Sequence, residues 1–256
     1  MKVNIIKKNP DSDKRLRKHF EVVDDGEVCI AIGGDGTFIR AVQGTERPVL
    51  LIRDGQGGSI GYYSDVSLKE IEYAISKLKN KDYSVEHLAN KIEITYNGRS
   101  YFAVNEARLN NIMQEVSFNV YERNGRGRSR IYPFVMSGDG MIVTGKIGST
   151  AYNKSAGGPI ILTPDVLCIT FLNSDGPYSN SIVMDGTKEL EVEIVKYEGI
   201  LAYDFSKIAK LKEGDKFTIR MSDKKINVVK LNGRKESFAD KLERKIRSRM
   251  VKEFKD

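Results

Sequence analysis

The segment from Glu27 to Ala41, with the sequence EVCIAIGGDGTFIRA, constrains the fold more than any other part of the chain. Val28 to Ile32 is a short apolar run rich in β-branched residues, which is typical of a buried strand in a parallel sheet. Glycines follow directly, and after Thr37 the apolar residues return at helical spacing. The segment therefore predicts a strand, a tight turn and a helix, which together form one unit of an α/β fold.

The predicted turn, Gly33-Gly34-Asp35-Gly36-Thr37, has the features of a phosphate-binding site. Its glycines leave no Cβ in the way of a ligand, and the N-terminus of a helix attracts anions. A carboxylate should repel phosphate, so Asp35 needs a separate explanation. It could accept a proton from an attacking hydroxyl group, hold a magnesium ion, or only cap the helix. The turn matches neither the P-loop nor the GxGxxG pattern.

Other signals in the first 82 residues extend this unit into an α/β domain. Strands are expected over 1–7 and 48–52, and helices from residue 11 or 12 to about 20 and over 67–79. The second helix has a capping box, Ser67 with Glu70. A second glycine-rich loop holds Tyr62 and Tyr63, which either stack on a base or pack against the protein. Parallel α/β sheets bind ligands at the carboxyl ends of their strands, where the glycine turn falls.

From about Tyr83 the pattern changes to short alternating or apolar segments separated by turn signals, and this predicts an antiparallel β domain over 83–235. Asn97-Gly98 and Asn124-Gly125 are such turn signals, and arginines flank the second of them. The expected strands lie at 91–96, 101–104, 116–121, 166–171, 190–195, 216–221 and 225–231. A helical rhythm from Phe238 to Met250 predicts a helix within 236–256 that packs on the first domain.

Composition narrows the possible functions. A net charge of +7 is compatible with polyanionic ligands such as nucleotides. Zinc-finger spacings and aromatic RNA-binding motifs are absent from the sequence, so no nucleic-acid partner is expected. No apolar run approaches the roughly 20 residues that cross a bilayer, and no signal peptide is visible, so a cytoplasmic protein without a membrane partner is expected. Cys29 and Cys168 lie in apolar runs, which predicts buried thiols in place of a disulfide or zinc site.

Three polar stretches interrupt the predicted β domain. Asn105-Glu106 follows an apolar run, Ser137-Gly138-Asp139-Gly140 precedes another, and Gly148 to Gly158 is a loop of small and polar residues. Each stretch alone fits an ordinary turn. A buried polar side chain must find a partner, however, and a bound ligand is one such partner.

Taken together, these motifs resemble a known family. The turn GGDGT is shared by NAD kinases, diacylglycerol and sphingosine-type lipid kinases, and phosphofructokinases. AVNE at 103–106, GDG at 138–140 and GSTAYNKSAGGPI at 148–160 follow it in the order and spacing of NAD kinases. Lipid kinases and phosphofructokinases do not carry that set. The chain therefore resembles the NAD kinase family over roughly residues 1–210.

The resemblance implies an α/β domain followed by a β domain, in a homodimer or homotetramer. It implies that the chain uses ATP or polyphosphate, with Mg²⁺ or another divalent metal, to convert NAD into NADP. Asp35 would take the proton from the 2′-hydroxyl of the adenosine ribose of NAD. Phosphate-donor binding is assigned to Gly33, Gly34, Gly36 and Thr37. NAD binding is assigned to Asp35, Gly36, Tyr62, Asn105, Glu106, Asp139, Thr150, Ala151, Tyr152, Ser155 and Asp204.

The sequence departs from the family pattern at two places. Thr144-Gly145-Lys146-Ile147 replaces an STPT-like segment, so that Ile147 stands where a Ser or Thr would contact NAD. The acidic-Gly pair of the family reads Asp204-Phe205. Two alternatives stay open. A lipid kinase would share GGDGT but would not explain the NE and GSTAY motifs, and a non-catalytic nucleotide-binding regulator would have no need for Asp35.

Overall fold

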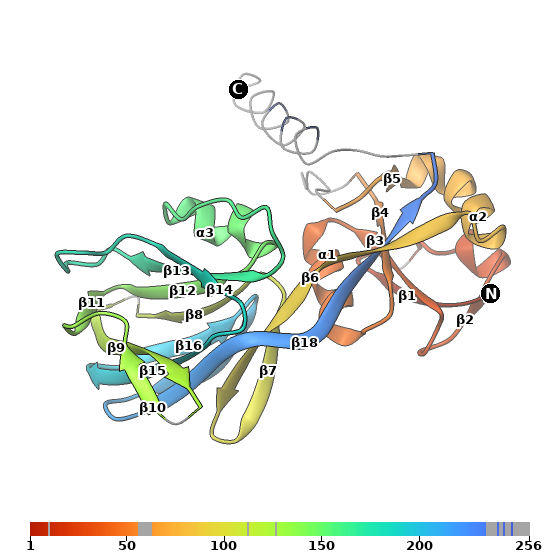
Figure 1. The fold of residues 1–256 in the computed structure, drawn as a ribbon. Coiled ribbons are helices and arrows are strands. Elements are labelled where there is room, and N and C mark those ends of the chain that lie inside the picture. Colours follow the sequence, from red (N-terminus) through yellow and green to blue (C-terminus); the bar gives the residue numbers. More distant parts are fainter. Residues whose placement is uncertain are drawn as a thin grey trace. The chain divides into compact units, whose positions relative to one another are not determined.

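The computed structural model describes residues 1–9, 11–55, 63–111, 113–125, 127–233, 240, 243 and 247 (Figure 1). The chain forms two compact units, Met1–His87 with Ile226–Asp256 and Leu88–Lys225. It passes from one unit to the other within two long strands, β6 (Tyr83–Tyr96) and β18 (Lys216–Leu231). Among the described residues, no helix is long and apolar enough to cross a membrane.

The first unit is built on a parallel sheet with the strand order β18-β4-β3-β1-β2, and β5 lies beside β4. The strands are β1 (Lys2–Lys7), β2 (Glu21–Val22), β3 (Val28–Gly33), β4 (Val49–Arg53) and β5 (Val66–Ser67). Every residue of β3 is buried, as expected for a central strand covered on both faces. The predicted strands at 1–7, 28–32 and 48–52 are thus confirmed to within one residue at each end.

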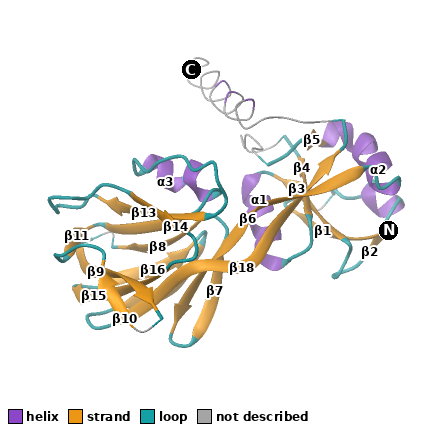
Figure 2. Cartoon of the chain, viewed as in Figure 1, coloured by secondary structure: helices purple, strands orange, loops and turns teal. Residues whose placement is uncertain are grey.

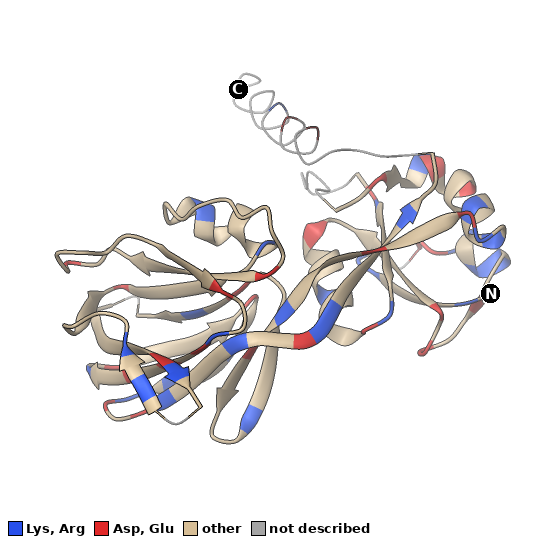
Figure 3. Ribbon diagram, viewed as in Figure 1, with Lys and Arg blue, Asp and Glu red and all other residues tan. Residues whose placement is uncertain are grey.

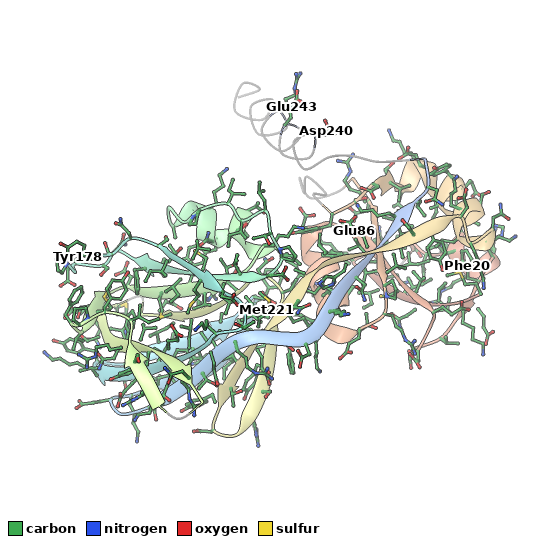
Figure 4. The ribbon with its side chains drawn as sticks, in the orientation of Figure 1. Phe20, Glu86, Tyr178, Met221, Asp240 and Glu243 are labelled. Carbon is green, nitrogen blue, oxygen red and sulfur yellow. The ribbon has the colours of Figure 1, made fainter. Side chains whose placement is uncertain are left out.

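Helices cover this sheet. One face packs against the 3₁₀ turn η1 (Leu16–Lys18) and the helix α2 (Ile71–Lys79), with Phe20 in the same apolar cluster (Figure 4). The helix α1 (Asp35–Gly44) packs on β3 and β4. The capping box is present at η2 (Leu68–Glu70), which leads into α2, so the helix predicted over 67–79 is confirmed.

The helix expected from residue 11 or 12 to about 20 is wrong, because only η1 forms there. Leu16 and Phe20 are its only buried apolar residues, and a single apolar pair gives too little packing to stabilise a full helix. Asp13, the buried acidic residue of this segment, forms ion pairs. Its carboxylate accepts hydrogen bonds from Lys7 Nζ at 2.6 Å and from Arg17 Nε at 2.7 Å. These ion pairs lower the pKa of Asp13 against the opposing effect of burial.

The second unit contains two groups of antiparallel strands (Figure 2). Their inward residues share one core. A six-stranded sheet has the order β14-β13-β12-β8-β16-β17, and the other group runs β10-β9-β15-β18, with β11 beside β9 and β6 paired with β7. The remaining bounds are β7 (Arg99–Ala103), β8 (Glu106–Asn110), β9 (Val116–Asn124), β10 (Gly127–Arg130), β11 (Met136–Gly138), β12 (Gly140–Thr144), β13 (Val166–Leu172), β14 (Ile182–Asp185), β15 (Glu189–Lys196), β16 (Gly199–Tyr203) and β17 (Ser206–Leu211). Two short helices, η3 (Gly148–Thr150) and α3 (Tyr152–Ser155), follow β12.

All strands predicted for this half of the chain are present, and most are longer than predicted. The segments 216–221 and 225–231 are one continuous strand, β18, since the polar residues between them stay extended. Seven strands of this half lay outside the predicted segments: β8, β10, β11, β12, β14, β16 and β17. The helix predicted within 236–256 lies largely outside the described residues. Cys29 and Cys168 are buried free thiols, as expected.

Arg123 and Arg128, on either side of Asn124-Gly125, lie on the β9-β10 hairpin, where acidic residues of β15 face them (Figure 3). Arg128 pairs with Glu191, Arg123 lies 3.6 Å from Glu189, and Lys188 of the preceding turn lies 2.6 Å from Glu122. Arg123 and Arg128 are therefore paired with acidic residues of the neighbouring strand β15.

Candidate active site

The glycine turn, Gly33 to Thr37, joins β3 directly to α1. Gly33 has φ +154°, and a Cβ on it would lie 2.2 Å from Thr37 Oγ1. Gly34 is the N-cap residue, and its carbonyl accepts the N–H groups of Thr37 at 2.9 Å and Phe38 at 3.2 Å. A Cβ on Gly36 would meet nothing within 4 Å. The helix thus begins at Asp35, earlier than the sequence indicated, and a glycine lies on each side of this residue.

Asp35 is a partly exposed carboxylate in the first turn of α1. Because Gly34 is the N-cap, Asp35 does not occupy the usual capping position. Its Oδ1 accepts the N–H of Tyr63 at 3.4 Å. Tyr63 in turn stacks on Phe38 of α1, with ring centroids 4.6 Å apart, so that this tyrosine packs against the protein. The position suits an ionised carboxylate, since the helix dipole stabilises negative charge there.

A second turn, Asn105-Glu106, joins β7 to β8, and we name it the acidic turn. It is held by Asp204, which is 3% exposed and lies at the turn between β16 and β17. The carboxylate of Asp204 accepts backbone N–H groups from Val104 at 2.8 Å, Asn105 at 2.7 Å and Glu106 at 3.2 Å. Asp204 therefore fixes the backbone that presents two predicted NAD-binding side chains.

The loop after β12 holds the acidic turn from another side. Thr144 Oγ1 donates a hydrogen bond to the carbonyl of Asn105 at 2.7 Å. A Cβ on Gly148 would lie 1.9 Å from that same carbonyl oxygen, so only glycine permits this close approach. Ile147, which stands where the family pattern has a polar residue, is 4% exposed, whereas Lys146 is partly exposed.

Glu106 is buried without full compensation. Its side chain is 5% exposed, and within the described part of the chain its Oε2 has no hydrogen-bond partner. Burial and the charge of Asp204 raise the pKa of Glu106 to about 7, while Arg108 acts to lower it. An unsatisfied buried carboxylate oxygen with a strongly perturbed pKa is typical of a ligand-binding position.

A cavity of about 360 Å³ opens elsewhere in the second unit, and it brings together residues from two of the predicted motifs, GDG at 138–140 and the loop at 148–160. Asp139, Tyr152 and Ser155, all predicted to bind NAD, line it. Asn173, which the sequence analysis did not single out, donates a hydrogen bond from Nδ2 to Asp139 Oδ2 at 2.6 Å. Asn110 and Asn111 line the same cavity and were also missed. Two adjacent asparagines, separated from the AVNE motif by three residues, were the signal that could have indicated them.

Buried polar groups hold the loop that carries Tyr152 and Ser155. Asn153 is fully buried; its Nδ2 donates to the carbonyl of Pro159 at 2.9 Å, and its Oδ1 accepts from Thr170 Oγ1 at 2.7 Å. Thr150 is 8% exposed, and its hydroxyl lies 3.5 Å from the carbonyl of Ile147. Ala151, partly buried, separates η3 from α3. Thr150 and Ala151 thus belong to the base of this loop, while Tyr152 and Ser155 are exposed.

The predicted site residues therefore form three groups. The glycine turn belongs to the first unit, and the acidic turn and the cavity belong to the second. Tyr62 lies outside the described residues. No cluster of three or more His, Cys, Asp or Glu side chains suited to a metal occurs among the residues that the structure describes.

Comparison with known proteins gives a consistent result. A family model described as the ATP-NAD kinase C-terminal domain matches residues 120–231. The NAD kinase of Thermoplasma volcanium is 32% identical over 234 residues, which cover 88% of this chain and 80% of that protein. The NAD kinase of Clostridium kluyveri is 33% identical over 218 residues, 80% of this chain and 74% of that protein.

Two solved structures share the fold. The NAD kinase from Archaeoglobus fulgidus, in complex with ATP, aligns with a TM-score of 0.76 at 21% identity and covers 95% of this chain and 99% of that one. Yeast NADH kinase, complexed with NADH, aligns with a TM-score of 0.77 at 16% identity and covers 95% of this chain and 86% of that one.

Proposed function

The chain belongs to the NAD kinase family, and from this premise we propose that it transfers the terminal phosphoryl group of ATP to the 2′-hydroxyl of the adenosine ribose of NAD, forming NADP. The observation that carries the proposal is Asp35, a partly exposed carboxylate in the first turn of the helix that follows the glycine turn. A carboxylate at this position gives a general base beside a site suited to phosphate.

The glycine turn would hold the phosphate donor. Gly33, Gly34 and Gly36 leave the backbone open to close approach, and the N-terminus of α1 favours the negative phosphates. Thr37 closes the turn through its N–H bond to Gly34. A triphosphate beside a dinucleotide concentrates negative charge, so we include Mg²⁺ in the proposal; when bound, it would neutralise charge on the transferring phosphoryl group.

Asp35 would take the proton from the ribose 2′-hydroxyl as that oxygen attacks the terminal phosphorus of ATP. The new O–P bond forms while the bond between the terminal phosphorus and its bridging oxygen breaks, and ADP leaves. A hydroxyl group is a weak nucleophile until a base lies within hydrogen-bond reach, and such a base contributes about 10² to 10⁴ in rate.

The second unit would hold NAD. The acidic turn offers the unsatisfied carboxylate oxygen of Glu106 as an acceptor for ribose hydroxyl groups. The cavity offers Asp139, Tyr152 and Ser155, which suit the polar and aromatic parts of a dinucleotide. Asp204, which the resemblance assigned to NAD, supports this proposal through the backbone of the acidic turn, and its direct contact with NAD stays a prediction.

Three further parts of the proposal are a homodimer or homotetramer, a cytoplasmic location, and polyphosphate as an alternative donor. The two buried free thiols agree with a reducing compartment. The lipid-kinase alternative shares the glycine turn but gives no role to the polar cavity. The alternative of a non-catalytic regulator gives no role to Asp35.

The test is NADP formation from NAD, ATP and Mg²⁺ by purified wild type, Asp35→Asn and Asp24→Asn, the last being an exposed aspartate of the same unit. We expect NADP from wild type and Asp24→Asn, and a loss of at least about 10² in kcat for Asp35→Asn with NAD binding retained. No NADP from wild type with NAD or NADH, and with ATP or polyphosphate, would overturn the proposal. Phosphorylation of diacylglycerol or a sphingoid base would favour the lipid-kinase alternative.

A further inference from the structure

Strand β8 carries a row of three polar side chains on one face. Residues two apart on a strand point the same way, so Glu106, Arg108 and Asn110 share this face, while Ala107 and Leu109 point into the apolar core. Asn110 lines the cavity that holds Asp139. Arg108 thus lies between the two groups of predicted NAD-binding residues in this unit. None of the family motifs described above includes it.

Arg108 is not an ordinary surface arginine. Its neighbours across the sheet are Ile142 on β12 and Ala202 on β16, both of which are buried. The residue is partly exposed, but its Nε is buried and has no hydrogen-bond partner in the described ranges. A guanidinium group held against apolar neighbours is costly unless an anion compensates it.

The anion nearest along the strand is Glu106. Its Oε2 is also unsatisfied, and Arg108 acts on it electrostatically. An unpartnered oxygen of Glu106 and an unpartnered Nε of Arg108 therefore lie on one face of the same strand, and the two residues are direct neighbours on that face. Their separation along the chain, about 6 to 7 Å between Cα atoms, allows attraction while each group still reaches for another partner.

We propose that Arg108 is a positioning residue for NAD: its guanidinium, next to Glu106 on the same face of β8, favours the charged form of that carboxylate, which accepts hydrogen bonds from ribose hydroxyl groups. The proposal rests on the proposed function, because it takes Glu106 as an NAD-binding residue.

The groups around Glu106 oppose its negative charge, so a nearby cation is needed to favour the ionised form. Asp204, from the turn between β16 and β17, repels a negative charge on Glu106, and β12 places the uncharged Thr144 opposite. Asp204 cannot turn away, because three backbone N–H groups hold it. Within the part of the chain that the structure describes, Arg108 favours the ionised form. Without it, Glu106 would be mostly protonated at neutral pH, and one of its oxygens would become a donor.

The experiment is calorimetric titration of NAD into wild type, Arg108→Gln, Arg108→Lys and Arg99→Gln between pH 6 and pH 9. Arg99 is an exposed arginine on β7 and serves as the matched control. A rise of one unit in the pKa of Glu106 would lower its ionised fraction at pH 7 about fivefold. We therefore expect NAD binding by Arg108→Gln to weaken about fivefold at pH 7 and to recover by pH 9. Arg108→Lys and Arg99→Gln should follow wild type.

Two results would overturn this inference alone: a loss of binding in Arg108→Gln that is the same at every pH, or a loss of equal size in Arg108→Lys. A merely structural role predicts the first. As a second check, Arg108→Gln should add nothing in a Glu106→Gln background, where no carboxylate is left to position. Wild type that fails to bind NAD at all would instead overturn the proposed function, and this inference with it.

Discussion

The glycine turn of the first unit and the acidic turn of the second are fixed by different means. The glycine turn is held largely by local contacts: Gly33 adopts a positive φ, the N–H groups of Thr37 and Phe38 bond to Gly34, and the N–H of Tyr63 adds one longer bond to Asp35. The acidic turn is held by side chains that lie between 39 and 100 residues away in sequence. The first turn can tolerate changes elsewhere in the chain, whereas the second depends on the whole β unit.

The two turns also treat their carboxylates differently. Asp35 is partly exposed and lies in the first turn of a helix, where negative charge is favoured. Glu106 is buried beside a second carboxylate, where negative charge is opposed. The difference suits the two proposed roles, since a base must reach its substrate, while a binding group gains strength from exclusion of water.

The largest effect should come from Asp204→Ala, which removes the long-range support of the acidic turn. Three backbone N–H groups would lose their acceptor. We expect the free energy of unfolding to fall by about 4 kcal/mol, and NAD affinity to fall with it. Chemical denaturation and NAD titration measure the two effects. Asp35→Asn, in the self-supporting turn, should change stability by less than about 1 kcal/mol.

An Asp204→Ala variant as stable as Asp35→Asn would show that the acidic turn holds itself, and the contrast between the turns would disappear. Asp204→Asn separates charge from hydrogen bonding. It keeps one acceptor oxygen and tolerates the positive φ of this position, +43°. Its stability should fall between those of wild type and Asp204→Ala.

The next effect concerns pH and the buried carboxylate. Burial and Asp204 raise the pKa of Glu106 from 4.5 to about 7. Between these values the folded protein keeps a proton that the unfolded chain releases, so this group's contribution to stability is complete below pH 4.5 and is lost as pH rises to about 7. Glu106→Gln has no such loss. We expect it to match wild type near pH 5 and to exceed it by about 3 kcal/mol at pH 8.

Urea denaturation of both proteins at pH 5 and pH 8 measures this difference, and Glu86→Gln, an exposed glutamate, is the control. The stabilised Glu106→Gln variant should bind NAD less tightly, because the amide replaces an anionic acceptor with a neutral one. Equal stability of wild type and Glu106→Gln at pH 8 would mean that the carboxylate is not opposed by its surroundings. The proposed role of Arg108 would then have no basis.

A smaller effect is expected at the glycine turn. Gly33→Ala places a Cβ at positive φ and within 2.2 Å of Thr37 Oγ1. Strain of this kind is worth about 2 kcal/mol. Gly36→Ala is the control for stability, since a Cβ there meets nothing within 4 Å. We expect Gly33→Ala to raise the KM for ATP and to leave NAD affinity unchanged. Weaker NAD binding in Gly33→Ala would show that the two turns do not act separately.

The contrast between local and long-range contacts also explains which parts of the structure could be predicted from the sequence. The strand β3, the glycine turn and α1 could be predicted because apolar runs, glycines and helical spacing are local signals. The hairpin at Asn97-Gly98 was predicted for the same reason, and both residues have positive φ. The prediction of a helix up to Phe20 was wrong, because this segment has too few apolar residues to pack a full helix against the sheet.

The acidic turn shows what could not be predicted. AVNE identified its residues through resemblance, but no local pattern shows that Asp204 supports the backbone there. The burial of Glu106 and the place of Arg108 beside it follow from the pairing of β8 with β12 and β16. Strands β14, β16 and β17 escaped prediction because several of their residues are half-exposed, which weakens the apolar pattern.

The smallest effect is expected from Thr144→Val, which removes one hydroxyl and keeps the shape of the side chain. Thr144 is fully buried, and its Oγ1 bonds to the carbonyl of Asn105 at 2.7 Å. We expect a loss of about 1 kcal/mol in the free energy of unfolding. Thr170→Val is the matched control, because Thr170 is also buried and bonds to Asn153 at the base of the α3 loop.

The two valine variants should differ in how they affect Glu106. Thr144→Val loosens the acidic turn, so NAD affinity should become more dependent on pH, whereas Thr170→Val should weaken NAD binding equally at all pH values. The pH profile of NAD binding, together with thermal unfolding, separates the two. If both variants gave the same pH profile of NAD binding, the hydrogen bond from Thr144 would not be needed for the geometry of the acidic turn. Asp204 alone would then set that geometry.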